Sequence, residues 1–354
     1  MNVQFSKPLR NRKKTIIRQY TLGWMAGLIF LVFIRSVGTV EVSRFNPSLD
    51  VAIFFAGLLG GFFGMISGYF QFLLEEKIYR QTSIKKLLII KGVYLLAFVV
   101  AMIFVAYLMS VHILKFEIGL WEFATDAGSG VVYLYIIVFD LFMLVLRQVN
   151  LMLGEGNLTK LLMGEFYEPH EEERIFMFLD LQSSTQLAEK LGHITYSNLI
   201  QDCFYDLGVV LAYEAEIYQY VGDEAILTWP TPAGIRNNNC LKAFYAFQHQ
   251  IELRKEHYEK AYGIVPFFKA GVNLGKVTTT EVGKYKREIA YHGDTLNTAA
   301  RIQAKCNELE KPLLVSQHLK DRILGRKFVF HFMGEMPLKG KEEAVAIYAV
   351  EPAS

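Results

Sequence analysis

The sequence predicts a multi-domain protein in which an N-terminal four-helix transmembrane bundle precedes a C-terminal α+β domain. Two observations support this fold class. Apolar residues are concentrated in the first 150 positions, and they bring the hydrophobic fraction of the 354-residue chain to 52% and its mean hydropathy to +0.24. From residue 174 onwards, strand-like apolar runs alternate with charged, helix-like segments. A chain of this length corresponds to about two or three domains of roughly 100–200 residues each.

Four long apolar segments predict the membrane-spanning helices. They cover about residues 20–40, 51–74, 87–114 and 128–146. Each reaches or approaches the roughly 20 residues that a helix needs to cross a bilayer. The first segment is too long for a cleaved signal peptide, and three more follow it. We therefore predict a four-span domain over residues 1–148 with a basic N-terminus and the lipid bilayer as its partner.

The distribution of basic residues predicts the orientation of these helices. Ten basic residues lie before the first apolar segment or between the second and the third: Lys7, Arg10, Arg12, Lys13, Lys14, Arg18, Lys77, Arg80, Lys85 and Lys86. The other two loops carry only Arg44 and Lys115. By the positive-inside rule, the N-terminus and the C-terminal domain are cytoplasmic, as in a multi-pass protein of the plasma (inner) membrane. Three cysteines without a pairing or metal-ligand spacing fit a reducing compartment.

Two features of the apolar segments predict contacts between helices. Asp140 falls well inside the fourth segment, where an ionisable group is costly. It is either a sensing or ion-linked residue or, as we favour, a carboxyl group hydrogen-bonded to a neighbouring helix. The second segment carries small residues at positions that predict close helix packing: Gly57, Gly60, Gly61, Gly64 and Gly68.

The C-terminal half predicts one sheet domain, 174–354, joined to the bundle by a linker, 149–173. Within the linker, residues 157–162 predict a short helix. The predicted elements that follow are a strand at 174–180, helices at 184–191 and 195–213, a hairpin at 215–229, a charged helix at 234–261, a strand pair at 266–291, a helix at 295–307 and short strands to 350. Mixed strands and helices of this kind indicate an α+β domain with its own core. The formal net charge of +2 gives no sign of a nucleic-acid partner, and none is expected.

Two aspartates at strand ends are the strongest functional signal. Asp180 closes the apolar run that begins at Arg174, and Asp223 lies in the Gly-Asp turn of the predicted hairpin. Carboxylates held at the ends of strands present hard oxygen ligands to Mg²⁺, usually alongside substrate phosphates. Phosphoryl or nucleotidyl transfer is therefore the first reaction class that the sequence indicates.

The loop after Asp180 predicts a phosphate site. Ser183, Ser184 and Thr185 lead from the strand into a helix, and Ser183 with Gln186 fits a capping box. The free N–H groups at the start of that helix would face a triphosphate.

A second group of residues lies in the helix predicted at 295–307. Asp294 is the predicted N-cap, after a turn at Gly293. Asn297 and Arg301 are four residues apart and share one helical face. A neutral donor and a fixed cation in this arrangement suit charge that develops on a phosphate. The alternative from spacing alone is an ordinary solvated face.

The stretch from Phe176 to the end of the chain resembles the catalytic domain of class III nucleotidyl cyclases, the adenylyl and guanylyl cyclases. Four motifs in the family's order, over about half of the chain, carry the resemblance: Phe178-Leu179-Asp180 with the Ser/Thr loop, Val221-Gly222-Asp223, Gly293 to Arg301, and Leu338-Lys339-Gly340-Lys341. The resemblance implies a ferredoxin-like βαββαβ core. It also implies that the 3′-hydroxyl of the nucleotide attacks the α-phosphate and that pyrophosphate leaves.

The resemblance implies a role for each candidate residue. Asp180, Asp223 and the backbone carbonyl of Leu181 would bind two Mg²⁺ or Mn²⁺ ions per active site, and Asn297 with Arg301 would stabilise the transition state. The nucleotide would contact a further set: Ser183, Ser184, Thr185, Gln219, Ala290, Asp294 and Lys339. In this family the site forms between two catalytic domains, so one domain per chain implies a head-to-tail homodimer with two sites.

The residues at the two purine-selecting positions depart from the family pattern. Adenylyl cyclases typically have Lys with Asp or Thr there, and guanylyl cyclases have Glu with Cys, whereas this chain has Gln219 and Ala290. The Gln219 amide can both donate and accept. Because no acidic side chain is present for the N1–H of guanine, we predict an adenylate cyclase that converts ATP to cyclic AMP and pyrophosphate in intracellular signalling. GTP use, by a guanylyl or dual-specificity cyclase, stays open because strong discrimination needs buried polar partners.

Three other function classes were weighed. The Gly222-Asp223-Glu224 turn is similar to that of diguanylate cyclases, but Val221 and Ala225 depart from their pattern and that family lacks the Asn/Arg helix. A non-catalytic nucleotide-binding membrane receptor is disfavoured because both aspartates, the Asn/Arg pair and Lys339 are retained. A channel or transporter is disfavoured because the four segments contain one deeply placed acid and no evident permeation path.

Overall fold

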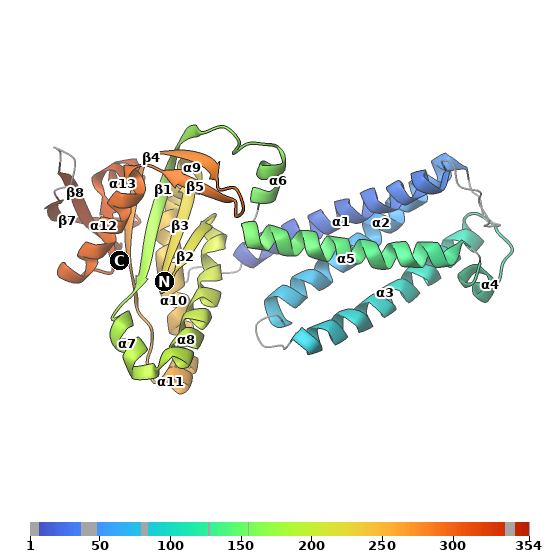
Figure 1. Cartoon of the computed structure of the whole chain (residues 1–354), viewed down its shortest axis with the longest axis horizontal. Helices are drawn as coiled ribbons and strands as arrows, with labels where there is room; N and C mark the ends of the chain where they lie inside the picture. The colour runs from blue at the N-terminus through green and yellow to red at the C-terminus, as the bar shows by residue number, and fades with distance from the viewer. Residues whose placement is uncertain are drawn as a thin grey trace. The chain divides into compact units, whose positions relative to one another are not determined.

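The computed structural model describes residues 7–36, 48–78, 84–126, 128–154, 156–336 and 344–353 of the chain. The chain divides into two compact units, Met1–Val149 and Asn150–Ser354, and Figure 1 shows the elements of each. The described residues of the first unit form helices, and the second unit is built around a β-sheet. The assignment of residues 149–173 as a coupling linker stays a prediction.

Four long helices make up the first unit. They are α1 (Lys7–Ser36), α2 (Leu49–Leu73), α3 (Ile84–His112) and α5 (Ser129–Leu153); a π-helical turn (Leu74–Ile78) extends α2, and the short α4 (Leu120–Ala124) precedes α5. Within the described residues, each long helix contains a stretch of 25 or 28 residues that is long and apolar enough to cross a membrane. The four predicted apolar helices are therefore confirmed, although their ends differ from the predicted ones by several residues.

Close packing of α2 against α1 depends on three glycines. A Cβ atom on Gly60, Gly64 or Gly68 would lie 2.7–2.8 Å from the Cα atom of an α1 residue. Real Cβ atoms essentially never come that close to another heavy atom, so only glycine lets the two backbones meet here. The predicted close packing is confirmed for these three positions, whereas a Cβ atom on Gly57 would meet nothing within 4 Å.

An aromatic cluster fills the middle of the bundle. The ring of Trp24 on α1 lies 5.1 Å from that of Phe98 on α3 and 5.0 Å from that of Phe139 on α5, measured between centroids. Phe63 of α2 completes the cluster at 5.3 Å from Phe98. Tilted and edge-on contacts at these distances are favourable for aromatic pairs, so all four long helices share one packed core.

A buried polar cluster joins the same four helices nearer the start of α1. Glu75, in the π-helical turn, accepts hydrogen bonds from Nε and Nη2 of Arg147 on α5 at 2.8 Å each, and both side chains are only 2% exposed. Arg12 of α1 donates to the same carboxylate at 2.9 Å. Gln71 donates to Glu75 and accepts from Lys91 of α3. The predicted segments end at 74 and 146, so the sequence did not place Glu75 and Arg147 inside the bundle, but the helices continue and bury both.

Asp140 lies seven positions, two helical turns, before Arg147 on α5 and is only 6% exposed. Its carboxyl group is hydrogen-bonded to the hydroxyl of Ser67 on α2. This contact agrees with the interpretation of Asp140 as a carboxyl group satisfied by a neighbouring helix.

The second unit is built on an eight-stranded sheet with the strand order β2-β3-β1-β4-β6-β8-β7, and β5 pairs with β4. The strands are β1 (His170–Leu181), β2 (Glu216–Val221), β3 (Glu224–Pro230), β4 (Phe268–Val282), β5 (Glu288–His292), β6 (Leu313–Ser316), β7 (Phe328–Met336) and β8 (Val345–Pro352). The helices are α6 (Asn157–Leu162), α7 (Ser184–Leu191), α8 (His193–Asp206), α9 (Thr231–Ile235), α10 (Asn239–Leu253), α11 (Lys255–Tyr262), α12 (Asp294–Glu308) and α13 (Gln317–Arg322).

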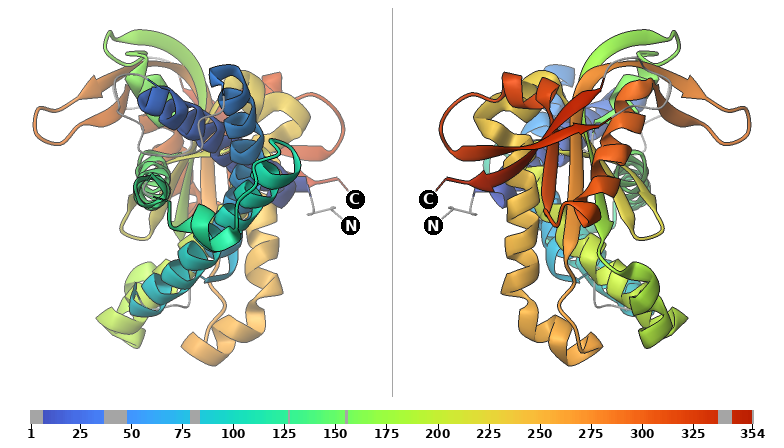
Figure 2. Two further views of the ribbon diagram at one scale, coloured as in Figure 1. Left: turned by 90° about the vertical axis from the view of Figure 1, so that its right-hand side faces the viewer. Right: turned by 90° about the vertical axis from the view of Figure 1, so that its left-hand side faces the viewer.

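The expected βαββαβ core is present at one half of this sheet. Strand β1 is antiparallel to both β3 and β4, α7 and α8 connect β1 to β2, and α10 lies between β3 and β4 in the chain. Figure 2 shows the β4–β5 hairpin (orange) extending from the sheet. This arrangement confirms the ferredoxin-like α+β fold that the sequence predicts.

The alternation of side chains along β1 divides the sheet into two faces. Ile175, Met177 and Leu179 join the main core, which α8 and α10 cover. Phe176 and Phe178 join a second cluster with residues of α12. Because alternate residues of a strand share a face, Asp180 lies on the α12 face of the sheet.

Three predicted elements differ from the structure. The strand predicted at 174–180 begins earlier, at His170. The helix predicted at 195–213 ends at Asp206 and continues as a 3₁₀ turn. The helix predicted at 234–261 is divided into α9, α10 and α11. Asn237 and Asn238, between α9 and α10, adopt left-handed backbone conformations with φ of 54° and 60°. Arg254, with φ −106° and ψ 17°, separates α10 from α11. Asparagine tolerates the left-handed region better than most residues do. The apolar periodicity of the segment does not reveal this backbone preference, so the sequence predicted one continuous helix.

Candidate active site

The two strand-end aspartates meet at one edge of the sheet. Asp180 lies next to the last residue of β1, in register with Glu224, the first residue of β3. Asp223 occupies the turn between β2 and β3, after Gly222, whose φ of 63° fits the tight hairpin. The carboxyl groups of Asp180 and Asp223 are hydrogen-bonded to each other. The predicted juxtaposition of the two carboxylates is therefore present.

The electrostatics of this edge favour a cation. Burial, followed by the nearby charge of Asp223, raises the pKa of Asp180 to about 6. Burial and the charges of Asp180 and Asp223 raise the pKa of Glu224 to about 7. Like charges held together in this way are relieved by a bound metal ion. Among the described residues, no group of three or more His, Cys, Asp and Glu side chains is arranged to hold a metal alone. Two carboxylates leave coordination positions for substrate oxygens.

Gln303 of α12 positions Asp180. Its amide nitrogen donates to Oδ2 of Asp180 at 3.2 Å. Helix α12 can pack this close to β4 because the strand residue that faces it is Gly271. A Cβ atom at Gly271 would lie 2.1 Å from the backbone nitrogen of Gln303. Gln303 was not among the predicted site residues. The available signal was Gly271 itself, since a glycine inside an apolar strand marks close approach of another backbone.

The loop after β1 differs from its prediction. Ser183 occupies the N-cap position of α7 with φ 58° and ψ 32°, and its side chain makes no capping hydrogen bond. The predicted capping box with Gln186 is therefore wrong, because a left-handed Ser183 does not have the extended backbone that an N-cap normally adopts. Ser183 and Thr185 are exposed and Ser184 is half-buried, whereas the side chain of Leu181 is buried. Ser183 is a non-glycine residue with a left-handed backbone, three positions after Asp180. Strained backbone conformations of this kind cluster at functional sites.

Helix α12 presents the predicted Asn/Arg pair. Asn297 is exposed and Arg301 is half-buried. The buried side of the helix is formed by other residues: Thr295, Thr298, Ala299, Ile302, Gln303 and Cys306. Gln303 contacts Asp180 of the same chain from the buried side of α12. Asn297 and Arg301 are not among the residues that form this buried side.

The start of α12 corrects the predicted cap. Gly293, with φ 151°, is the N-cap residue, and the helix begins at Asp294. The carboxylate of Asp294 accepts a hydrogen bond from the hydroxyl of Thr298 at 3.1 Å, inside the first turn. Lys339, the expected triphosphate contact, lies outside the described residues, within 337–343.

A β-bulge controls the direction of Gln219. The register of β2 on β3 shifts between Ile217 and Gln219. Ile217 packs against the main core, and Tyr220 stacks on Phe204 of α8 at 4.5 Å, so both lie on the same face. Tyr218, in contrast, belongs to the cluster on the α12 face. The bulge thus breaks the alternation and leaves Gln219 on the α12 face beside Tyr218.

A buried cation lies close to Ala290, the second position predicted to select the purine. Arg174 is only 2% exposed, pairs with Glu216 of β2, and places its guanidinium 4.9 Å from the ring centre of Tyr291. Tyr291 adjoins Ala290, which is half-buried and pairs with Thr280 of β4. Arg174 was predicted only as the start of a strand. Its contacts instead join β1, β2 and β5 near Gln219 and Ala290, the two residues predicted to contact the purine.

Comparison with known proteins agrees with this geometry. A family model described as the adenylate and guanylate cyclase catalytic domain matches residues 166–352, more than half of the chain. Adenylate cyclase 2 of Rhizobium meliloti (strain 1021) is 34% identical over 209 residues, which is 58% of this chain and 58% of that protein. The terminal-differentiation-specific adenylate cyclase of Dictyostelium discoideum is 25% identical over 185 residues, 49% of this chain and 8% of that protein.

Solved structures agree at the level of the fold. A bacterial light-regulated adenylyl cyclase is similar with a TM-score of 0.54 at 18% identity, over 64% of this chain and 67% of that one. The chain thus spans little more than half of the first curated relative and two thirds of this structure. On the strength of the family match, the chain belongs to the adenylate and guanylate cyclase catalytic domain family.

Proposed function

We propose that this protein is a membrane-bound adenylate cyclase that converts ATP to cyclic AMP and pyrophosphate. The observation that carries the proposal is the pair of hydrogen-bonded carboxylates, Asp180 and Asp223, at the strand ends of a cyclase-family sheet. The choice of ATP is supported by two relatives named adenylate cyclases.

In the proposed mechanism, Asp180, Asp223 and the carbonyl of Leu181 hold two Mg²⁺ or Mn²⁺ ions. Bound divalent ions would lower the pKa of the ribose 3′-hydroxyl and neutralise the phosphate charge. Gln303 keeps the Asp180 carboxylate oriented through its hydrogen bond at 3.2 Å. The backbone and hydroxyl groups of Ser183, Ser184 and Thr185 lie beside the phosphates.

The complete site requires a second copy of the chain. Asn297 is exposed, and the side of α12 that carries it is not the one buried against the sheet. In a head-to-tail homodimer, Asn297 and Arg301 of one copy would face the aspartates of the other. There the amide and the guanidinium would stabilise charge that develops at the α-phosphate, and Lys339 would bind the outer phosphates.

The purine would bind on the α12 face, where the bulge directs Gln219. Its amide can accept from the adenine amino group and donate to N1, and Ala290 adds no side-chain hydrogen bond. Arg174 supports this region from beneath through Glu216 and Tyr291.

The membrane placement rests on four helices that are long and apolar enough to span a bilayer. The basic residues put the N-terminus and the catalytic domain in the cytoplasm. Residues 149–173 would then couple the bundle to the catalytic domain.

Product formation by the full-length protein tests the reaction. The purified protein in detergent is incubated with ATP or GTP, first with Mn²⁺ and then with Mg²⁺. We expect cyclic AMP from ATP, and we expect Asp223→Ala to abolish it while the variant stays folded. Cyclic GMP as the main product would overturn the base assignment, and full activity of Asp223→Ala would overturn the metal assignment.

A further inference from the structure

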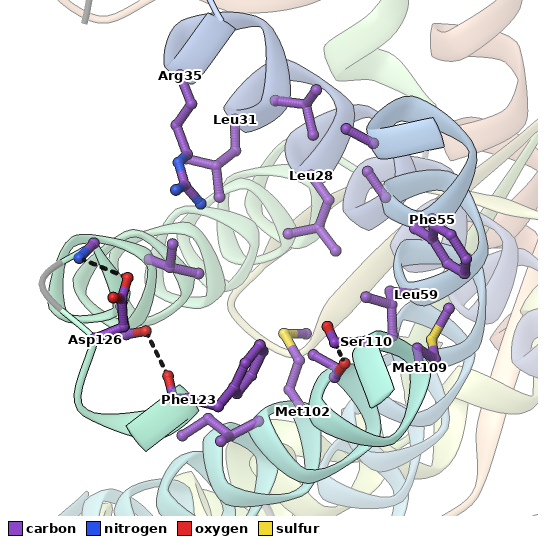
Figure 3. A pocket seen from close by; sticks show the side chains of 18 of the residues that line it. Leu28, Leu31, Arg35, Phe55, Leu59, Met102, Met109, Ser110, Phe123 and Asp126 are labelled. Atoms are coloured by element: carbon purple, nitrogen blue, oxygen red, sulfur yellow. Dashed lines mark hydrogen bonds between the residues drawn. The ribbon is translucent and has the colours of Figure 1, made fainter. Parts of the chain in front are cut away.

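The transmembrane bundle contains a cavity of about 270 Å³ at the end opposite to the buried polar cluster. Figure 3 shows side chains of α1, α2, α3, α4 and α5 around it. The walls come from the last turns of α1 and α3 and the first turns of α2 and α5. The labelled apolar side chains include Leu28, Leu31, Phe55, Leu59 and Met102.

The cavity contrasts with the tight packing of the rest of the bundle. On one side of the aromatic cluster, α1 and α2 meet through Gly64 and Gly68 at backbone contact. On the other side, small residues line an open space: Ala52, Ala56, Ala106, Ser110 and Ser129. Protein interiors are normally close-packed, and this partly open cavity leaves its walls without the dispersion contacts that an occupant would supply. Small side chains facing a void therefore indicate space kept for an occupant.

The polar groups of the cavity identify the chemistry of that occupant. Three hydroxyls in the lining donate to backbone carbonyls: Ser110 to Ala106 at 2.9 Å, Ser129 to Phe123 at 3.0 Å, and Tyr133 to Ala124 at 2.8 Å. Their protons are committed, but their lone pairs can still accept a hydrogen bond.

The charges at the cavity give no preference for an ion. Among the described residues, the lining includes one cation, Arg35, and one anion, Asp126, which lie at the same end of the space in Figure 3. Asp126 already accepts a hydrogen bond from the backbone nitrogen of Gly128 at 3.4 Å. An uncharged ligand with a hydrogen-bond donor fits such a lining better than a charged ligand does.

We propose that this cavity binds one small uncharged amphiphile, an apolar chain that carries a single hydroxyl group. The chain lies against Leu28, Leu59 and Met102, and the hydroxyl donates to the lone pairs of the lining hydroxyls. The volume is just below the range of roughly 300–1,000 Å³ for drug-sized ligands, which indicates a small molecule. The inference goes beyond the proposed function, which assigns no ligand to the bundle.

Photolabelling tests the site in the full-length protein reconstituted in lipid nanodiscs. The probe is decan-1-ol that carries a diazirine on its chain, and unlabelled decan-1-ol is the competitor. We expect saturable labelling of α3 peptides that contain Met102 or Met109, which unlabelled decan-1-ol prevents. Labelling that rises without saturation, and that the competitor does not reduce, would show only contact with the lipid-facing surface and would overturn the proposal.

Two substitutions fill the cavity from different helices. Ala106→Leu on α3 and Ala52→Leu on α2 each add bulk to the lining, and either should weaken competition by decan-1-ol about tenfold or more through overpacking of the bound chain. The matched control is Ala101→Leu on α3, where the alanine is exposed, and it should change nothing. The thermal midpoints of all three variants show whether they fold. If one of the two cavity variants does not fold, the other still tests the site.

Two results would contradict this assignment. Unchanged competition in both folded cavity variants would place the probe elsewhere. Decanoate or decylammonium competing at least about tenfold better than decan-1-ol, equivalent to about 1.4 kcal/mol, would show that the site selects a charge and would overturn the uncharged class.

Discussion

Asp180, a proposed metal ligand, destabilises the folded protein when its carboxyl group is ionised. Its folded-state pKa of about 6 lies above its ordinary value of 3.8. The folded state therefore holds this proton more tightly than the unfolded state does. Stability falls as the pH rises from about 4 through 6, and above that range the ionised carboxylate destabilises the metal-free protein.

Asp180→Asn should abolish cyclase activity and raise the thermal midpoint of the metal-free protein. The amide removes the charge, and its oxygen can still accept from Gln303. Thermal unfolding with a chelator at pH 7.5 and at pH 5 measures the effect, which should be larger at pH 7.5. A midpoint below wild type at pH 7.5, with no such loss in the surface variant Asp321→Asn, would contradict this electrostatic explanation.

Gln219 is the residue at which we expect base selectivity to change. Gln219→Glu supplies a carboxylate that accepts from the N1–H and amino group of guanine. Because a hydrogen bond to a charged group contributes about 1.5–3 kcal/mol, the ratio of GTP to ATP turnover should rise about tenfold or more. Values of kcat/KM for both nucleotides measure this ratio, with Gln317→Glu on α13 as the control. An unchanged ratio would place the purine away from the bulge in β2.

At the level of elements, the π-helical turn after α2 ties the helices of the bundle together. It carries two consecutive acids, and Arg12 of α1 reaches both, Glu75 at 2.9 Å and Glu76 at 2.5 Å. The Glu75 side chain is 2% exposed and that of Glu76 is 24% exposed. The two neighbours thus share Arg12 as a partner, whereas Glu75 is also buried and accepts hydrogen bonds from Arg147 and Gln71.

Glu75→Gln should destabilise the protein by about 3–5 kcal/mol, because it removes the buried carboxylate charge that accepts two hydrogen bonds from Arg147. Glu76→Gln should cost about 1 kcal/mol or less, as for partly exposed ion pairs. Denaturant unfolding of the detergent-solubilised protein compares the two. Equal losses would mean that burial of the Glu75–Arg147 pair is not what distinguishes the two acids.

The elements also show what the sequence could and could not predict. Hydropathy found the four long helices, and apolar runs that end in carboxylates found Asp180 and Asp223, because both signals are local. The Glu75–Arg147 pair and the Gln303–Asp180 bond were missed because each joins positions far apart in the chain. The capping box at Ser183 was wrong because backbone conformation decides a cap as much as residue type does.

At the scale of the whole molecule, the two units follow different physical rules. The bundle combines glycine contacts, tilted and edge-on ring contacts and a buried ion pair. These contacts suit the proposed membrane location, because lipid gives little hydrophobic drive between helices. The catalytic unit has a conventional core on both faces of its sheet. Since the complete site is proposed to need two copies, the assembly and not the single chain is the catalytic entity.

Complementation between two inactive variants tests this central claim most directly. Asp223→Ala removes a metal ligand and Asn297→Ala removes the donor proposed to act on the other copy, so each variant alone should be inactive. Co-expressed and purified together, they should recover about a quarter of wild-type cyclic AMP formation, because half of randomly formed dimers are mixed and each has one intact site. Mixed dimers that form but stay inactive would contradict a site shared between two copies.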